Sequence, residues 1–164
     1  MKKTSKLLKA RPIWILCLFL ALCLSVGIIG GFATNSSVTS WYPTLMKPTW
    51  TPPSWVFGPV WTVLYVLIAL CGWLIYMQPS SPARSKALLF FGIQLVLNLI
   101  WSPLFFGLQS PLLGLITIVL LWIAILATLF SLWKVSRLAA ALWLPYTIWV
   151  TYALTLNAAI YVMN

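Results

Sequence analysis

Five apolar stretches dominate the sequence, and each is long enough to cross a lipid bilayer as a helix. A membrane-spanning helix needs roughly 20 mostly apolar residues. The connections between the stretches are mostly too short to hold a second domain. The sequence therefore predicts an all-α integral membrane protein, a five-transmembrane-helix bundle that forms a single domain over residues 1–164. The expected helices cover about residues 12–33, 56–77, 87–107, 111–133 and 138–162.

The composition excludes several classes of function. Charged residues make up 6% of the chain, against roughly 25% in a water-soluble domain, so lipid is the expected solvent. The 164 residues include no Asp, Glu or His, which removes the usual groups for acid–base catalysis and most metal ligands. Cys17, Cys23 and Cys71 lie in apolar stretches without paired spacing and are expected to be packing residues. We expect no metal site and no obligatory cofactor.

The positive charges are distributed unevenly between alternate loops. Only Lys47 lies in the first loop, whereas the other nine cations precede the first stretch or lie in the second and fourth loops. The positive-inside rule then places the N-terminus in the cytoplasm and the C-terminus outside, as in a bacterial inner membrane. This placement indicates a lipid bilayer rather than nucleic acid as the partner of the net charge of +10.

The first apolar stretch has two further interpretations. Gly31-Phe32-Ala33 resembles a signal-peptide cleavage site, but the preceding run is longer than the roughly 7–15 apolar residues of a signal peptide. We therefore expect an uncleaved helix. Gly27 and Gly31 form a GxxxG spacing, which lets two helices approach closely. The spacing leaves open whether this is a homodimer contact or packing within one bundle.

The connection over about residues 34–55 is the longest one and is rich in proline and aromatic residues. Its four prolines restrict the backbone. Its three Trp and one Tyr suit a membrane interface, where such rings collect. An interfacial aromatic belt does not require this density of proline, so we favour a lid-like loop over a pocket.

Three stretches each carry aromatic or amide side chains on one helical face. The spacings of three and four residues place these side chains in line. The stripes are Phe57, Trp61 and Tyr65; Gln94, Asn98, Trp101 and Phe105; and Tyr146, Trp149, Ala153 and Asn157. The amides should face the interior, because an unpaired amide in hydrocarbon costs free energy. They either bond neighbouring helices or line a pocket for a planar, aromatic, weakly polar ligand.

Several of these segments together resemble the TspO/MBR family, which is the translocator protein or peripheral benzodiazepine receptor group. The matching segments are Trp41-Tyr42-Pro43-Thr44-Leu45-Met46-Lys47-Pro48-Thr49-Trp50-Thr51-Pro52-Pro53, Pro59-Val60-Trp61-Thr62-Val63-Leu64-Tyr65, Asn98-Leu99-Ile100-Trp101-Ser102-Pro103-Leu104-Phe105-Phe106, Pro145-Tyr146-Thr147-Ile148-Trp149, Ala153 and Leu156-Asn157. The resemblance implies a five-helix membrane protein, often dimeric, whose pocket opens toward the first loop.

The resemblance also implies ligands and site residues. Family members bind porphyrins, notably protoporphyrin IX, and some bind cholesterol or synthetic benzodiazepine-type ligands. The ligand-binding residues it implies are Tyr42, Pro43, Trp50, Trp61, Tyr65, Asn98, Trp101, Trp149 and Ala153. The cholesterol motif of animal members needs a Lys or Arg after a Tyr near the end of the fifth helix. Tyr161 is followed only by Val162-Met163-Asn164, so that motif is absent.

Three functions follow as hypotheses. The first is binding of porphyrin-like tetrapyrroles for sensing, sequestration or regulation of tetrapyrrole and stress metabolism, with Lys47 at the pocket mouth available to pair a propionate. The second is light-dependent porphyrin breakdown that uses Trp61 and Trp149 as catalytic residues. The third is facilitated transport of small hydrophobic ligands. Ion-coupled transport is disfavoured, because such coupling usually relies on charged residues within the membrane and the chain has no acidic residue.

Overall fold

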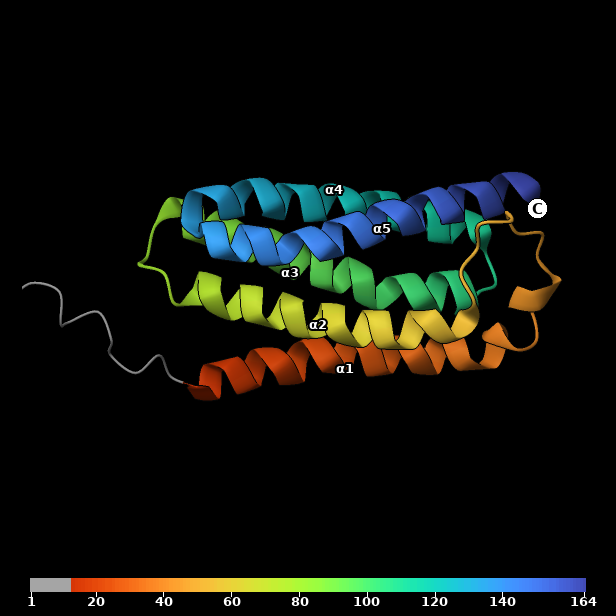
Figure 1. Ribbon diagram of the computed structural model, residues 1–164, viewed down its shortest axis with the longest axis horizontal. Helices are drawn as coiled ribbons and strands as arrows, with labels where there is room; N and C mark the ends of the chain where they lie inside the picture. Colours follow the sequence, from red (N-terminus) through yellow and green to blue (C-terminus); the bar gives the residue numbers. More distant parts are fainter. Residues whose placement is uncertain (1–12) are drawn as a thin grey trace, which may run out of the picture.

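The computed structural model describes residues 13–164 and is built from five long helices (Figure 1). All five are long and apolar enough to cross a membrane, and no strand occurs within residues 13–164. The prediction of an all-α five-span bundle is therefore confirmed. The helices are α1 (Ile13–Val38), α2 (Ser54–Tyr76), α3 (Pro82–Ser102), α4 (Pro111–Val135) and α5 (Arg137–Met163), with short helices η1 (Tyr42–Thr44) and η2 (Pro103–Gly107).

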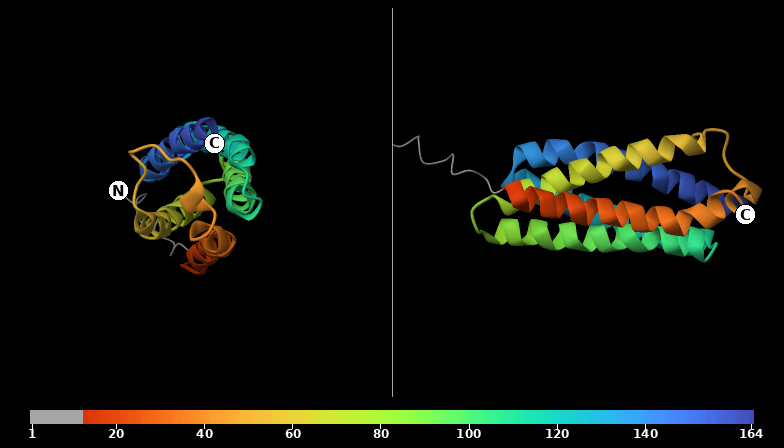
Figure 2. Two further views of the ribbon diagram at one scale, coloured as in Figure 1. Left: turned by 90° about the vertical axis from the view of Figure 1, so that its right-hand side faces the viewer. Right: turned by 90° about the horizontal axis from the view of Figure 1, so that it is seen from below.

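The five helices form a ring rather than a sheet-like row. Around the ring, α1 contacts α2, α2 contacts α5, α5 contacts α4, α4 contacts α3, and α3 contacts α1. The end-on view in Figure 2 shows this ring, with the connection between α1 and α2 crossing one end. The C-terminus lies at the same end as that connection (Figure 1). We call this end the loop end.

Serine caps determine where three of the helices begin. The Ser81, Ser110 and Ser136 hydroxyls each accept a hydrogen bond from the backbone N–H three residues later. Such caps satisfy a backbone donor that the first helical turn leaves free, and Pro82 and Pro111 suit the first helical position. Helix α3 consequently begins at Pro82, whereas the apolar pattern placed its start near residue 87.

Helix α1 continues beyond the apolar run and shortens the lid-like connection. The sequence placed the start of this connection near residue 34, but α1 ends at Val38. The Thr34 hydroxyl donates to the Gly30 carbonyl at 2.8 Å, and the Ser37 hydroxyl donates to the Phe106 carbonyl at 2.7 Å. These bonds satisfy the polar side chains inside the bundle, so a polar sequence continues as helix. The connection therefore comprises residues 39–53.

The end of α3 changes to a wider π-helical turn. The Leu108 N–H donates to the Pro103 carbonyl at 2.9 Å, and the Ser110 N–H donates to the Phe105 carbonyl at 3.1 Å. The sequence predicted one uniform helix through residue 107. Because Pro103 lacks an N–H, the regular bonding pattern is interrupted there. The π-turn brings Phe105 and Phe106 into the bundle, where both are buried.

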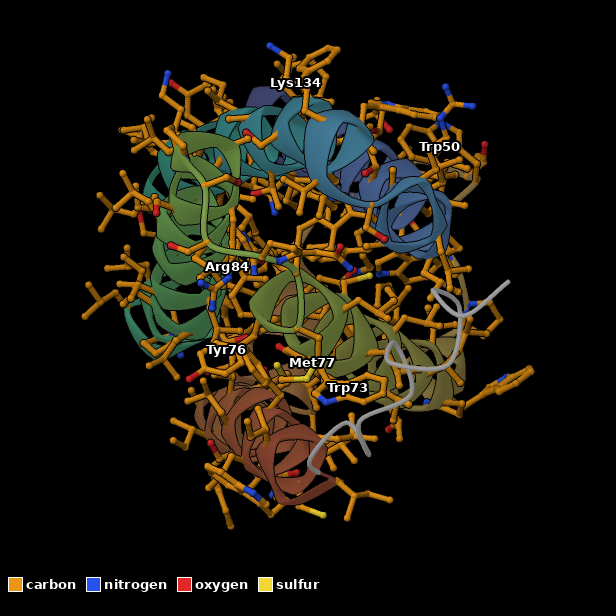
Figure 3. The ribbon with its side chains drawn as sticks, turned by 90° about the vertical axis from the view of Figure 1, so that its left-hand side faces the viewer. Trp50, Trp73, Tyr76, Met77, Arg84 and Lys134 are labelled. Carbon is orange, nitrogen blue, oxygen red and sulfur yellow. The ribbon has the colours of Figure 1, made fainter. Side chains whose placement is uncertain are left out.

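The half of the ring opposite the loop end is filled by side chains. A Cβ added to Gly72 would lie 2.6 Å from the Phe19 ring and 2.7 Å from the Phe91 ring, so these rings fill the space beside the glycine. Trp143 is fully buried and donates to the Ile125 carbonyl at 3.2 Å. Figure 3 looks onto this end, where the Arg84 guanidinium lies 5.0 Å from the centre of the Tyr76 ring. The bundle is therefore closed here.

Candidate functional site

The loop-side half of the ring encloses a cavity of about 660 Å³. Residues from all five helices line it, together with Tyr42 of η1. Pockets for small molecules typically measure about 300–1,000 Å³ and are mostly apolar with a few polar groups. The cavity has the size and composition of a small-molecule site.

Aromatic rings form much of the cavity wall. The Trp101 and Phe105 rings are stacked, with centroids 5.3 Å apart and planes 12° apart. The Trp61 and Tyr65 centroids lie 5.5 Å apart, and the Trp149 ring meets Phe57 edge-on at 5.9 Å. Offset stacked and edge-to-face pairs of this kind are favourable beyond the area they bury. The wall therefore presents well-ordered ring faces to an occupant.

A chain of four hydrogen-bonded side chains forms the polar floor of the cavity. Tyr65 donates to the Asn98 carbonyl oxygen at 2.7 Å. The Asn98 amide donates to the Tyr146 hydroxyl at 2.8 Å, and that hydroxyl donates to the Gln94 carbonyl oxygen at 2.8 Å. Only Tyr65 and Asn98 line the cavity, while Gln94 and Tyr146 are fully buried behind them. The chain fixes the orientation of the Asn98 amide.

Three buried polar atoms of cavity-lining residues have no hydrogen-bond partner among the residues that the structure describes. They are the Asn157 Oδ1 and the indole N–H groups of Trp101 and Trp149. An unpaired buried donor or acceptor costs about 1–3 kcal/mol. These groups give the apolar wall a small number of donors and one acceptor that remain unused within the protein.

The connection between α1 and α2 is held over the end of the ring by its own backbone and by α5. The Lys47 ammonium donates to the carbonyls of Tyr42 at 2.8 Å, Pro43 at 3.3 Å and Leu45 at 2.8 Å. It also lies 4.9 Å from the centre of the Tyr42 ring. All three donors of Lys47 are thus used within the loop. The pairing of Lys47 with a propionate stays a prediction, and it would require Lys47 to leave these carbonyls.

Tyr42 is the loop residue that reaches the cavity. Its ring is buried and packs against Phe106 with centroids 5.6 Å apart. Burial raises the pKa of the Tyr42 phenol, and the nearby Tyr152 adds to this increase. The hydroxyl therefore stays neutral at physiological pH.

Most of the expected ligand-binding residues line this one cavity. Seven of them do so, and the seven are Tyr42, Trp61, Tyr65, Asn98, Trp101, Trp149 and Ala153. Pro43 and Trp50 are exposed and are not part of the wall. Trp50 instead packs on Tyr152, and its carbonyl accepts the Tyr152 hydroxyl at 2.8 Å. These two residues belong to the cover of the bundle.

The sequence pattern missed the contributions of α1 and α4. Ile118 and Leu121 of α4 line the cavity, as do Leu24 and Ile28 of α1. These residues sit in the long apolar runs of α1 and α4, where no polar or aromatic stripe distinguishes the cavity face from the lipid face. Only the Gly27/Gly31 spacing marked that face of α1, and it was interpreted as a packing motif.

The glycines of α1 differ in what surrounds them. A Cβ at Gly27 would lie 2.7 Å from the Tyr65 ring, and one at Gly30 would lie 3.3 Å from the Ser102 hydroxyl. Both positions therefore serve close packing within the bundle. Gly31 lines the cavity, and a Cβ there would meet nothing within 4 Å.

The fold and the cavity define a class, a polytopic helical membrane protein with an internal, aromatic-lined site. The sequence profile of the TspO/MBR family matches residues 19–163, and the chain belongs to this family. The site described above is therefore the internal cavity of a TspO/MBR-family membrane protein.

Named relatives support this assignment over nearly the full length. The chain is 41% identical to the tryptophan-rich protein TspO of Chlorobaculum tepidum, over 94% of this chain and 98% of the relative. It is 44% identical to the tryptophan-rich protein TspO of Archaeoglobus fulgidus, over 86% of this chain and 91% of the relative. It is also 34% identical to the human translocator protein, over 92% of this chain and 90% of the relative.

Proposed function

We propose that the protein binds a porphyrin-like tetrapyrrole, of the protoporphyrin IX class, in the loop-side cavity. The observation that carries the proposal is the presence of aromatic ring faces and an amide of fixed orientation in one cavity. Trp61, Trp101 and Trp149 offer surfaces for a planar conjugated ligand. Asn98, held by Tyr65 and Tyr146, offers a hydrogen-bonding group at a defined orientation.

The same cavity supports a role in sensing or sequestration rather than conventional catalysis. The described residues contain no cluster of metal-ligating side chains, and the full sequence has no carboxylate or imidazole. A site without acid–base groups can hold a ligand and report its presence through the loop that covers it. We propose this as the function, in a bacterial inner membrane.

The test is a dark titration of the detergent-purified protein with protoporphyrin IX, followed by tryptophan quenching. We compare wild type with the double variant Trp61→Phe, Trp149→Phe. Replacing an indole by the smaller phenyl ring weakens an aromatic contact, and such contacts are worth about 0.5–1.5 kcal/mol each beyond area burial. Since about 1.4 kcal/mol is a tenfold change in Kd, the affinity should fall by about tenfold.

The control is the double variant Trp14→Phe, Trp133→Phe, which removes two indoles that are 62% and 52% exposed outside the cavity. It should bind as wild type does. Equal affinities in all three proteins, or quenching that never saturates, would mean that the porphyrin only partitions into the micelle or onto the apolar surface.

A second candidate function is light-dependent breakdown of the bound porphyrin, with dioxygen as the oxidant. The observation that favours it is a row of oxidisable side chains, because Trp61 lies 5.5 Å from Tyr65 and 6.3 Å from Tyr146 between ring centroids. Illumination of the porphyrin complex in air should bleach the pigment in wild type. Bleaching at the same rate in the Trp61→Phe, Trp149→Phe variant would count against a role for the indoles.

A further inference from the structure

The exposed part of the cavity wall is confined to α1 and α2. Most cavity-lining residues are buried or half-buried. These include every lining residue on α3, α4 and α5. The exposed lining residues are Ile28, Gly31 and Asn35 on α1 and Ser54, Gly58 and Thr62 on α2. The cavity therefore reaches the molecular surface between these two helices. We call this opening the α1–α2 window.

The spacing of these residues produces two facing stripes. Positions 28, 31 and 35 share one face of α1, and positions 54, 58 and 62 share one face of α2, because they recur every three or four residues. The two neighbouring helices run in opposite directions (Figure 1). The stripes thus run from Ile28 and Thr62 at the deep end, past the two glycines, to Asn35 and Ser54 at the loop end.

The lower edge of the window is a tight helix contact. A Cβ at Gly27 would lie 2.7 Å from the Tyr65 ring, so α1 and α2 touch at this level. Below it, Phe19 lies against Gly72 of α2. Above it, the two helices diverge toward the loop end, as the view from below in Figure 2 shows. The opening therefore has a closed floor at the level of Gly27.

The covering loop is attached to α5 and the C-terminal residue rather than across the α1–α2 window. The Met46 N–H donates to the Asn164 Oδ1 at 2.9 Å, and the Asn164 amide donates to the Met46 carbonyl at 3.0 Å. The Tyr152 hydroxyl of α5 donates a hydrogen bond to the Trp50 carbonyl at 2.8 Å. These contacts seat the loop on α5 and the C-terminus. The end of the ring is covered while the side between α1 and α2 stays open.

The two glycines at the centre of the window lie at matching depths. Gly31 is four residues inside the end of the span Ile13–Asn35, and Gly58 is four residues inside the start of the span Ser54–Tyr76. At 1.5 Å per residue, each lies about 6 Å inside its apolar span. A Cβ at either position would meet nothing within 4 Å. Both glycines at the centre of the window therefore lie within the apolar spans, near their loop-side ends.

We propose that the α1–α2 window is a lateral entrance, through which the ligand passes from the loop-side leaflet of the bilayer into the cavity. This inference rests on the proposed function for the identity of the ligand. The window selects molecules that already dissolve in the leaflet with a polar edge at the headgroups. Asn35 and Ser54 face that polar edge, and Ile28 and the glycines face the apolar body.

The first test measures binding kinetics in lipid vesicles. The variant Gly31→Leu, Gly58→Leu adds bulk to the window at two positions where a Cβ meets nothing within 4 Å. We follow tryptophan quenching after mixing with vesicles that carry protoporphyrin IX. Association and dissociation should both slow by at least tenfold. A blocked wall contact would instead change the Kd and leave association fast.

The matched control is Gly92→Leu, on an exposed face of α3 outside the cavity, where a Cβ also meets nothing within 4 Å. Its rates should equal those of wild type. The proposal is overturned if the window variant keeps wild-type rates while Asn164→Ala, which releases the loop, accelerates binding. The proposal is also overturned if the window variant keeps wild-type rates but lacks a dimer that wild type shows in light scattering. The surface would then be a contact with a second copy of the chain.

A second measurement does not depend on porphyrin binding. A nitroxide label at Gly31→Cys, in a Cys17→Ala background, should collide more with lipid-dissolved dioxygen than with a water-soluble nickel(II) chelate. The same label at Thr49→Cys in the exposed loop should show the opposite preference. If wild type does not bind porphyrin, the proposed function fails while this result still stands. A nickel preference at Gly31→Cys would overturn the lateral entrance.

Discussion

At the scale of single residues, the Tyr146 hydroxyl is expected to contribute to stability because it is buried and bonded to two amides. It is fully buried, accepts from Asn98 and donates to Gln94. Tyr146→Phe leaves both amide groups without this partner in the membrane interior. We expect unfolding in detergent to become easier by about 1–3 kcal/mol, the usual cost of an unsatisfied buried group, as measured by thermal or denaturant unfolding.

Tyr152→Phe is the matched control for this change. Its hydroxyl donates to the Trp50 carbonyl at an exposed position, where water can replace the bond. The variant should lose less than about 1 kcal/mol. Equal losses in the two variants would show that the Tyr65–Asn98–Tyr146–Gln94 chain contributes no special stability. The sequence placed these four residues on interior helical faces, but it could not show which side chains bond each other, because that depends on helix rotation and distance.

At the scale of structural elements, the π-turn η2 depends on a glycine in the next helix. A Cβ at Gly114 would collide with the Phe105 ring, which stacks on Trp101 at the cavity wall. Gly114→Ala should destabilise the protein by about 1–3 kcal/mol through overpacking and weaken porphyrin binding. Gly92→Ala, on open helix surface, should instead stabilise by about 0.5–1 kcal/mol. Thermal unfolding of both variants measures these stability changes. A Gly114→Ala protein that is more stable than wild type would contradict the packing argument.

The loop over residues 39–53 depends on Lys47 as an internal clamp. Lys47→Met removes three hydrogen bonds to loop carbonyls while keeping most of the apolar stem. We expect faster amide hydrogen exchange in residues 41–53 and little change in global unfolding. Lys134→Met, on the opposite end of the bundle (Figure 3), should leave loop exchange unchanged. Unaltered exchange in Lys47→Met would show that proline alone stiffens the loop.

The sequence predicts only part of the structure of η2 and of the loop over residues 39–53. The prolines of the loop and the apolar run of α3 were visible, so a stiff connection and a helix could be predicted. The π-turn and the Lys47 clamp could not, because both depend on contacts that form only when the chain is folded. Phe105 needs the space beside Gly114, and Lys47 needs carbonyls that converge on it.

At the scale of the whole molecule, the number of spans was predictable and their order around the ring was not. Apolar length alone identifies five spans. The order α1, α2, α5, α4, α3 depends on which faces fit together, and the long apolar runs of α1 and α4 give no pattern that distinguishes their faces. The cavity wall from these two helices was consequently missed, although the aromatic stripes of α2, α3 and α5 located the rest of it.

The distribution of charge makes a prediction about the orientation of the whole bundle. Lys47 is at the loop end, whereas Arg84, Lys86, Lys134 and Arg137 lie in or beside the connections at the opposite end. The positive-inside rule places that opposite end in the cytoplasm. In a Cys17→Ala background, a membrane-impermeant maleimide should label Thr49→Cys in intact cells and Ser80→Cys only after permeabilisation. Both positions are exposed, so accessibility within the protein is matched. The reverse labelling would place the cavity and its lateral entrance in the cytoplasmic leaflet, and its ligand would then have to be drawn from the inner face of the membrane.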